Sequence, residues 1–429
     1  MTTTVNPQRS ARTAMRKTIV GTGIGNAVEW YDWAIYATFT PFIASQLFSK
    51  ADPASAVLST LAIFAVGFVA RPFGGFVFGW IGDRVGRKAS MTLAVGLASL
   101  GSLMIGIAPT FAAVGAWASL MLLVARLVQG LAHGGELPSS QTYLSEMAPK
   151  EHRGFWATLI YTSGTVGILF GTLLGAVLNM ALSTEVMNAW GWRIPFLIGA
   201  AMGLYALIMR ARLHETDVFE GETVTEKRAP IWPQIVQHRK QALQVIGLTV
   251  GLTVIYYIWG VVAPSYATTA LKIDRGEALW AGVIGNIVFI AALPFWGKLS
   301  DKIGRKKVLW SGAIGSAVMH FPMTWLLKDS AWQLAVGMSV MLIFIAASAA
   351  IVPAVYAELF PTSIRTVGVG VPYSICVALF GGTAPYLQQW LGTTLRMPDL
   401  FNVYAVVLLA VSAAFVFTLP ETKGKDLAH

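Results

Sequence analysis

The chain of 429 residues is 55% hydrophobic and only 12% charged, with a mean hydropathy of +0.62. Because soluble domains carry about 25% charged residues, this composition excludes a protein that exposes most of its surface to water. The net charge of +10 does not indicate nucleic-acid binding, since the basic residues recur in short loops between apolar runs and do not form one patch.

Twelve apolar stretches follow one another along the chain, each long enough to cross a bilayer as an α-helix of about 20 residues. They cover residues 18–48, 55–80, 89–108, 112–137, 154–181, 193–212, 242–269, 277–298, 308–327, 331–356, 365–391 and 400–420. The longest polar segment, 213–240, separates the sixth stretch from the seventh. We therefore expect an all-α membrane protein with twelve transmembrane helices, in which six-helix bundles over 1–212 and 241–429 are joined by a linker over 213–240.

The distribution of basic residues predicts the orientation in the membrane. If the N-terminus is cytoplasmic, the inside segments carry 23 Lys and Arg residues and the outside segments carry 6. The outside residues are Lys50, Arg193, Lys272, Arg275, Lys328 and Arg396. Since basic residues are retained on the cytoplasmic side, both termini and the linker are expected to be cytoplasmic. The expected location is a bacterial-type inner membrane.

A ten-residue motif occurs twice, 218 positions apart, at matching points of the two halves. It reads GWIGDRVGRK from Gly79 and GKLSDKIGRK from Gly297. Such internal repetition is typical of duplicated membrane transporters.

The charged residues of this motif suggest a gate. We predict that they form a cytoplasmic cluster that locks one conformation and releases the other. The predicted gating residues are Asp83, Arg84, Arg87, Asp301 and Arg305. The alternative is that the basic residues only satisfy the topology rule.

Four ionisable side chains lie inside predicted spans of the first half, where a charge is costly and therefore a functional candidate. Glu29 and Asp32 stand three residues apart and share a helical face. Arg71 lies roughly 18 Å from the motif loop at about 1.5 Å per residue, and Arg126 lies well within the fourth span.

Their chemistry suggests a division of roles. Arginine binds carboxylates through a planar fork and stays charged, so Arg71 and Arg126 are predicted to hold an anionic substrate. A carboxyl group in a low-dielectric cavity can take up a proton near neutrality, so Glu29 and Asp32 are predicted to carry the coupling proton. The alternative is that the four groups only neutralise one another and tie helices together.

Three further polar residues follow Arg126 at helical spacing. Gln129 is one turn away and can support the guanidinium group or a ligand. His133 is two turns away and is a possible proton relay or a hydrogen-bonded packing residue. Glu136, one turn further, is expected to brace the motif loop as part of the gate.

The second half has no comparable charge in the middle of its spans, and its expected cavity residues are neutral. They are Tyr256, Tyr257, Trp259, Asn286 and Tyr373, to which Tyr31 of the first half is added as a substrate-binding candidate.

The doubled motif, the twelve spans and the central linker resemble the major facilitator superfamily. Three stretches resemble its metabolite:proton symporter family, namely GNAVEWYDW (Gly25–Trp33), ARPFGGFVFG (Ala70–Gly79) and ARLVQGLAHGGE (Ala125–Glu136). WGWRIPF (Trp190–Phe196) and AELFPTSIR (Ala357–Arg365) also fit. The resemblance covers nearly the whole chain. It departs at Leu137-Pro138, where the family pattern continues with Tyr-Gly or similar residues.

This resemblance implies a monomeric importer that moves a small organic acid, such as α-ketoglutarate or another di- or tricarboxylate, together with protons by alternating access. The open alternatives are a zwitterionic or shikimate-like substrate and a proton-coupled drug antiporter. A membrane enzyme is not expected, because no nucleophile, metal or cofactor constellation is visible, and no Walker motif indicates ATP. No cofactor is expected, and the predicted partners are the substrate, protons and lipid. A receptor that binds without transporting is the remaining class.

Overall fold

We analysed a computed structural model of the chain, which describes residues 7–84, 87–134, 141, 144–146, 148–211, 237–361 and 365–427. Within these ranges, the side chains of residues 7–22, 79–80, 82–84, 87–91, 209–211 and 366–367 are outside the description. The described ranges are almost wholly helical and contain no strand.

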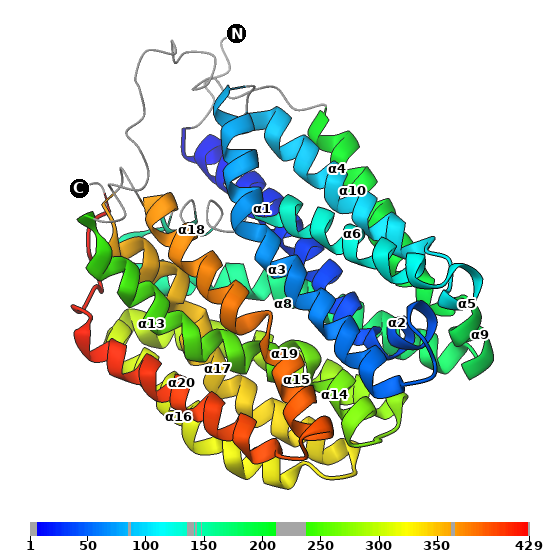
Figure 1. Cartoon of the computed structure of the whole chain (residues 1–429). Coiled ribbons are helices and arrows are strands. Elements are labelled where there is room, and N and C mark those ends of the chain that lie inside the picture. Colours follow the sequence, from blue (N-terminus) through cyan, green and yellow to red (C-terminus); the bar gives the residue numbers. More distant parts are fainter. Residues whose placement is uncertain are drawn as a thin grey trace.

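The first six predicted spans correspond to helices of the N-terminal half (Figure 1). The first span is formed by α1 Pro7–Thr38 and α2 Thr40–Leu47, the second by α3 Pro53–Arg84, and the third by α4 Arg87–Gly106. The fourth is formed by α5 Phe111–Val114 and α6 Ala116–His133, the fifth by α8 Arg153–Ala181, and the sixth by α10 Ile194–Ala211. The short helix η1 Lys150–His152 precedes α8, and α9 Thr184–Ala189 and η2 Gly191–Arg193 precede α10.

The other six spans correspond to helices of the C-terminal half. The seventh span is formed by α13 Arg239–Tyr256, η3 Tyr257–Val262 and α14 Ala263–Ala270. The eighth, ninth and tenth are α15 Arg275–Ile303, α16 Arg305–Leu326 and α17 Ala331–Leu359. The eleventh is formed by α18 Arg365–Cys376, η5 Val377–Gly381, α19 Ala384–Gln389 and η6 Trp390–Thr394, and the twelfth is α20 Pro398–Thr418. The prediction of an all-α fold with two six-helix bundles is confirmed. The predicted linker falls largely on residues 212–236, which the structure does not describe.

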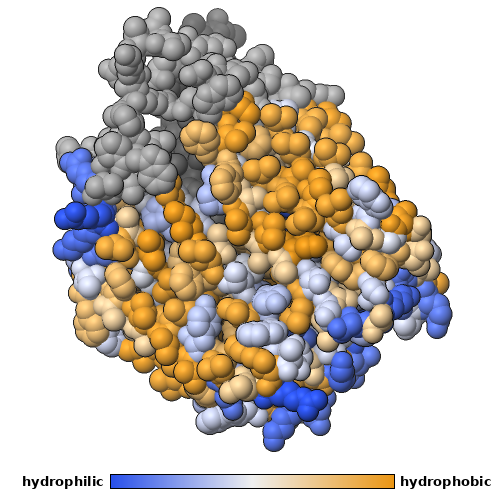
Figure 2. Space-filling model, in the orientation of Figure 1, coloured by the Kyte–Doolittle hydropathy of each residue, from blue (hydrophilic) through white to orange (hydrophobic). Residues whose placement is uncertain are grey.

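The surface is that of a protein embedded in lipid. Nine helical segments of the described chain are long and apolar enough to cross a membrane, and Thr92–Gly106 is a shorter apolar helix. Large apolar side chains such as Phe73, Phe76 and Phe417 are more than half exposed. Apolar residues cover most of the face in Figure 2, and hydrophilic residues gather at its ends.

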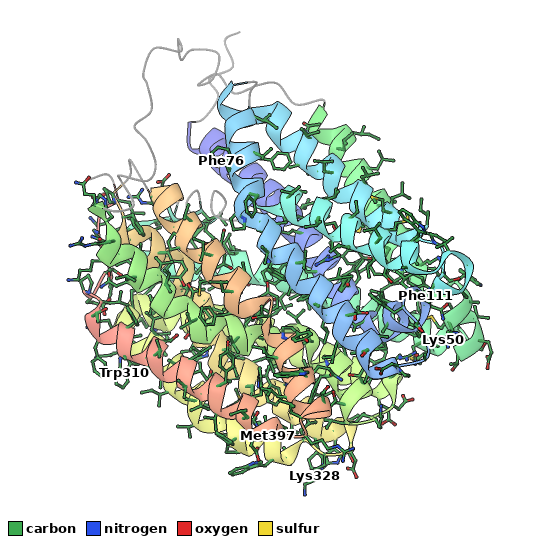
Figure 3. The ribbon with its side chains drawn as sticks, in the orientation of Figure 1. Lys50, Phe76, Phe111, Trp310, Lys328 and Met397 are labelled. Carbon is green, nitrogen blue, oxygen red and sulfur yellow. The ribbon has the colours of Figure 1, made fainter. Side chains whose placement is uncertain are left out.

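The two ends of the molecule carry different loops. We call the side on which α1 begins and α20 ends the terminal face (Figure 1). Lys50, Phe111, Lys328 and Met397 lie toward the opposite end in Figure 3. Lys50 and Lys328, which the sequence assigns to outside loops of different halves, therefore lie at the same end of the molecule.

The halves pack most closely along α8 and α15. A Cβ atom on Gly297 of α15 would lie 2.5 Å from the Thr158 methyl group and 2.9 Å from the Gly154 carbonyl oxygen, both in α8. Because only glycine fits at such a distance, the repeated motif of the second half brings its helix onto the first half.

Three glycines of α8, spaced four residues apart, form a smooth stripe on the helix surface. They face α1 within the same half: Gly167 lies against Ala27, Gly171 against Ile35 and Gly175 against Thr38. The stripe thus holds α1, which carries the buried acidic residues, in a fixed position against α8.

We predict that Gly167→Ala destabilises the folded protein by about 1–3 kcal/mol, because the new Cβ would lie 2.0 Å from the carbonyl oxygen of Ala27. Gly171→Ala is the matched control, since the nearest atoms to its Cβ belong to side chains and none is closer than the Ile35 methyl group at 3.1 Å, which can adjust. Thermal unfolding in detergent measures both, and equal melting temperatures for the two variants would contradict this packing argument.

Candidate functional site

Four charged residues meet in the interior of the N-terminal half. Glu29 and Asp32 come from α1, Arg71 from α3 and Arg126 from α6, and each is at most 5% exposed. Arg71 Nη2 lies 3.2 Å from Glu29 Oε1, which forms an ion pair. We call these four residues together with His133 the charged cluster.

Arg126 reaches Asp32 only through two intermediate side chains. Its Nη1 donates to Gln129 Oε1 at 2.8 Å, and Gln129 Nε2 donates to Ser102 Oγ at 2.8 Å. Ser102 Oγ in turn donates to Asp32 Oδ1 at 3.0 Å. This chain of hydrogen bonds links the fourth span to the first. A change in the charge of the Asp32 carboxylate therefore alters the electrostatic environment of Arg126.

The indole of Trp33 organises the basic groups of the cluster. The guanidinium carbon of Arg126 lies 3.9 Å from its ring centroid, and that of Arg71 lies 4.4 Å away. The His133 ring centroid is 6.1 Å from the same indole. Cation–π attraction thus partly compensates two buried guanidinium groups.

Several nitrogen atoms of this region have no hydrogen-bond partner among the described residues. They are Nε and Nη2 of Arg126, Nε of Arg71, Nε1 of Trp33 and Nδ1 of His133. Buried polar groups are normally paired, and unpaired ones in a folded protein call for a functional explanation. Most of these atoms are donors, so their common complement is an anion.

A small cavity lies next to the cluster and is enclosed by residues of both halves. Its lining consists of Trp30, Tyr161, Thr249, Leu252, Thr253, Tyr256, Tyr257, Tyr356 and Tyr373, and we call it the aromatic cavity. The Trp30 ring centroid lies 5.6 Å from that of Tyr256 and 6.0 Å from that of Tyr257. The first half therefore meets the second through aromatic rings.

Aromatic contacts also connect the cavity to the charged cluster. The Phe68 ring centroid is 5.2 Å from that of Tyr257 and 4.0 Å from that of Trp33, and it lies 4.6 Å from the guanidinium carbon of Arg71. These contacts place the charged cluster and the aromatic cavity next to each other, with the Phe68 ring in contact with both.

Two predicted substrate-binding residues do not join this site. The Tyr31 hydroxyl donates to the carbonyl oxygen of Pro195 at 2.7 Å, and its ring packs against Phe170 of α8. Asn286 donates to the carbonyl oxygen of Gly282 within α15 and does not line the aromatic cavity. By contrast, the cavity does contain Tyr256, Tyr257 and Tyr373.

At the terminal face, Asp301 of the second motif copy binds the first half directly. Its carboxylate accepts the backbone N–H groups of Gly154 and Phe155, at 2.8 and 2.9 Å, in the first turn of α8. A carboxylate is favoured at a helix N-terminus by the unpaired N–H groups and the helix dipole. Asp301 also pairs with Arg305 at 2.7 Å.

A second buried carboxylate, that of Glu358, joins the halves beside Asp301. It pairs with Arg153 of α8 at 3.0 Å and with Arg305 of α16 at 3.3 Å, and it accepts a hydrogen bond from the Thr422 hydroxyl at 2.6 Å. Arg365 of α18 pairs with Glu146. We call these residues the inner network, and it closes the terminal face between the halves.

The remaining predicted gating residues cannot be placed in this network. The backbones of Asp83, Arg84 and Arg87 lie in α3 and α4, but their side chains are outside the description, and Glu136 falls outside the described residues altogether.

Sequence reasoning missed several residues that the structure brings into these sites. Trp33 was detectable, because it lies one helical turn after Glu29 in the GNAVEWYDW stretch. Glu358 and Arg365 lie in AELFPTSIR, which carried the family resemblance without an assigned role. Ser102 is an ordinary small residue of an apolar span, and nothing in the sequence marks it.

Comparison with known proteins agrees with this architecture. A family model described as "Sugar (and other) transporter" matches residues 18–229 and 220–429. The α-ketoglutarate permease of Escherichia coli strain K12 is 33% identical over 411 residues, which cover 95% of this chain and 94% of the permease.

A putative proline/betaine transporter of Staphylococcus aureus strain COL is 34% identical over 422 residues, covering 96% of this chain and 90% of the relative. Among solved structures, that of a D-xylose-proton symporter has a TM-score of 0.74 at 20% identity, covering 95% of this chain and 99% of the symporter.

We predict that Glu358→Gln weakens folding by about 3–5 kcal/mol, because it leaves the guanidinium groups of Arg153 and Arg305 buried without their shared carboxylate. It should also open the terminal face. Melting temperature and maleimide labelling of a cysteine at Thr158, in a Cys376→Ser background, measure the two effects.

The matched control is Asp426→Asn, which removes the exposed ion pair with Lys150 and should change stability by less than about 1 kcal/mol. If Glu358→Gln neither melts earlier nor labels faster than this control, the inner network does not hold the halves together.

Proposed function

Because the chain belongs to the sugar (and other) transporter family of the major facilitator superfamily, we propose that it is a proton-coupled symporter that imports a small organic acid. The substrate carboxylate binds at Arg126, and its uncharged part enters the aromatic cavity. The observation that carries this proposal is the state of Arg126, which is fully buried and is linked to Asp32 only through Gln129 and Ser102.

Electrostatics favour binding of an anion at this position. A buried guanidinium group without a directly bonded carboxylate loses its hydration, and the aromatic rings and the single hydrogen bond to Gln129 offset only part of that loss. Two of its nitrogen atoms have no hydrogen-bond partner in the described part of the chain. A carboxylate satisfies both through the planar fork geometry, which makes Arg126 the primary substrate anchor.

Charge balance explains why a proton would accompany the substrate. With His133 neutral, the cluster contains two carboxylates and two guanidinium groups, so its net charge is zero. A bound monocarboxylate adds one negative charge to a low-dielectric site, and protonation of Asp32 removes one. Each binding event therefore favours the other, and this reciprocity is the thermodynamic basis of symport.

The hydrogen-bond chain supplies the route by which Asp32 and Arg126 sense each other. A protonated Asp32 can donate to Ser102, whose hydroxyl then no longer donates to Asp32. Ser102 Oγ can then accept from both Asp32 and Gln129, because a hydroxyl oxygen has two lone pairs. With Asp32 neutral, the chain compensates the charge of Arg126 less, which favours an anion at that guanidinium group. Ser102 and Gln129 thus act as positioning residues between the proton site and the substrate site.

Alternating access is provided by the inner network. It is formed in this structure, so substrate release to the terminal side requires separation of α8 from α15 and loss of the Glu358 ion pairs. We propose that the halves, 1–212 and 241–429, rock about the central site, with 213–240 as a cytoplasmic linker. The terminal face is cytoplasmic, and the protein works as a monomer in a bacterial inner membrane.

We predict opposite defects for two conservative variants in proteoliposomes with an imposed pH gradient. Arg126→Lys should raise the KM for labelled α-ketoglutarate at least tenfold, because ammonium cannot replace the bidentate fork. Asp32→Asn should retain exchange of internal for external substrate but lose accumulation driven by the gradient, because the carboxamide cannot take up the proton.

Arg193→Lys is the control, since Arg193 donates to the Ala108 carbonyl oxygen far from the cluster, and it should transport normally. Gradient-driven accumulation by Asp32→Asn equal to wild type would remove Asp32 from the coupling mechanism.

The aromatic cavity supports a second candidate substrate, a zwitterion with a quaternary ammonium group. Rings of Trp30, Tyr256 and Tyr257 surround a space close to Arg71 and Arg126, and aromatic rings bind such cations through their faces. A relative that is 34% identical is described as a putative proline/betaine transporter.

Competition and substitution distinguish the two candidates. If the substrate is a zwitterion, unlabelled glycine betaine should inhibit uptake and Trp30→Leu should weaken betaine binding about tenfold or more, because the cation loses a ring. If the substrate is a dicarboxylate, betaine should not compete, and about two protons should enter per substrate, since Glu29 must then release Arg71 for the second carboxylate. The proton-to-substrate ratio measures this directly.

A further inference from the structure

The second half contains a buried imidazole that the proposed mechanism does not use. His320 of α16 has no exposed surface, and its Nδ1 accepts the indole N–H of Trp259 at 3.2 Å. An Nδ1 that accepts carries no hydrogen, so the imidazole is neutral with its hydrogen on Nε2. A polar ring in an apolar core without this bond would be destabilising.

Trp259 belongs to an irregular turn beside the aromatic cavity. Helix α13 ends at Tyr256 and continues as the π-helix η3, Tyr257–Val262. A π-helical turn breaks the regular hydrogen-bond ladder of the helix and occurs frequently at functional sites. Trp259 is one of its six residues.

The two sides of this turn have different neighbours. Tyr256 and Tyr257 face the first half and meet the ring of Trp30. Trp259, expected from the sequence to line the cavity, is not part of its wall. It lies inside the C-terminal half, where a Cβ on Gly337 of α17 would be 3.1 Å from its ring.

This arrangement makes the Trp259–His320 bond an anchor for the cavity wall. Residues two apart in a helix point to nearly opposite sides, so fixing the Trp259 ring fixes the rotation at which Tyr257 is presented. We infer that His320 is a positioning residue of the binding site: by holding the Trp259 N–H, it sets the orientation of η3 and thereby of Tyr256 and Tyr257 in the aromatic cavity. The inference rests on the proposed function, in which this cavity receives the substrate.

Three variants separate the hydrogen bond from the ring that makes it. His320→Leu removes the acceptor, Trp259→Phe removes the donor but keeps an aromatic ring, and His320→Asn retains an acceptor near the position of Nδ1. Uptake of labelled α-ketoglutarate and labelled glycine betaine gives KM and maximal rate. Hydrogen exchange of the backbone amides over 256–262 reports the state of the turn without any substrate.

For the substrate that the protein carries, His320→Leu and Trp259→Phe should each raise KM about fivefold with a nearly unchanged maximal rate, which is the effect expected from one lost hydrogen bond. Exchange should accelerate over 256–262 and remain unchanged in the rest of α13. His320→Asn should restore both readouts, and the double variant Trp259→Phe/His320→Leu should be no worse than either single one.

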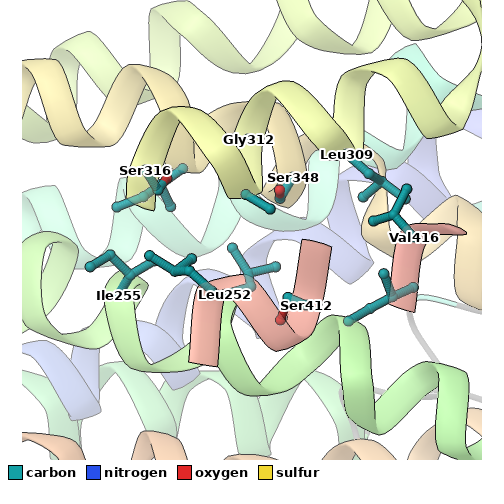
Figure 4. Close-up of a pocket in the computed structure, with 12 residues that line it drawn as sticks. Leu252, Ile255, Leu309, Gly312, Ser316, Ser348, Ser412 and Val416 are labelled. Carbon is teal, nitrogen blue, oxygen red and sulfur yellow. The ribbon is translucent and has the colours of Figure 1, made fainter. Parts of the chain in front are cut away.

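The control is Ser316→Ala on the same helix. Ser316 is 1% exposed and lines the apolar cavity between α13, α16, α17 and α20 (Figure 4), and neither Trp259 nor His320 is part of that lining. This variant removes a buried hydroxyl group of α16 and leaves both Trp259 and His320 in place. Its KM and its hydrogen exchange over 256–262 should therefore equal those of wild type.

The inference is overturned if His320→Leu lowers the melting temperature while KM stays at the wild-type value, or if Trp259→Phe leaves both KM and exchange unchanged. If wild-type protein takes up neither probe, the proposed function is at fault. Unchanged exchange over 256–262 in both variants would then still reject the anchor, and accelerated exchange confined to that turn would support it.

Discussion

The cost of burying charge in an apolar bundle is the constraint on which the rest of this structure depends. Glu29, Asp32, Arg71 and Arg126 have no bulk water to stabilise them, so protein groups must do so. Arg71 has Glu29 at 3.2 Å, but Arg126 has only Gln129, the faces of aromatic rings and an indirect connection to Asp32. This unequal compensation is the reason why we propose Arg126, and not Arg71, as the first binding site for a substrate carboxylate.

Buried charge is also costly in the inner network, but there the guanidinium groups have carboxylate partners. There, Glu358 and Asp301 compensate Arg153 and Arg305 within hydrogen-bond distance, and backbone N–H groups of α8 complete the coordination of Asp301. A fully paired network is stable as long as it is closed, and becomes costly when its members separate without water. Opening therefore requires hydration of the interface, which suits a gate that alternates between a dry and a wet state.

The features that the sequence predicted are those that appear as patterns among residues close together in the chain. Long apolar runs predicted the twelve spans. Glu29, Asp32, Arg71 and Arg126 were recognisable as candidates because they are isolated charged residues inside spans of one half. Helix phase predicted that Gln129 shares a face with Arg126. Tyr31 was a less suitable candidate on the same grounds, because it stands two residues from Glu29 and so points to the other side of α1, toward Pro195. Ser102 and His320 were not predictable, since their partners lie 70 and 61 positions away.

Substrate identity is hard to derive from sequence for a related physical reason. The second half contributes rings and hydroxyl groups to the aromatic cavity, and no charged residue appears among the described residues that line it. In the proposed mechanism, the charge that a substrate can bring is set by how many protons Glu29 and Asp32 accept, because every added negative charge must be balanced in the same low-dielectric space. A monocarboxylate needs one proton and a dicarboxylate two, whereas a zwitterion places its positive end on the rings. Under this proposal the same residues can serve different substrates, and the protonation of Glu29 and Asp32 decides among them as much as the shape of the cavity does.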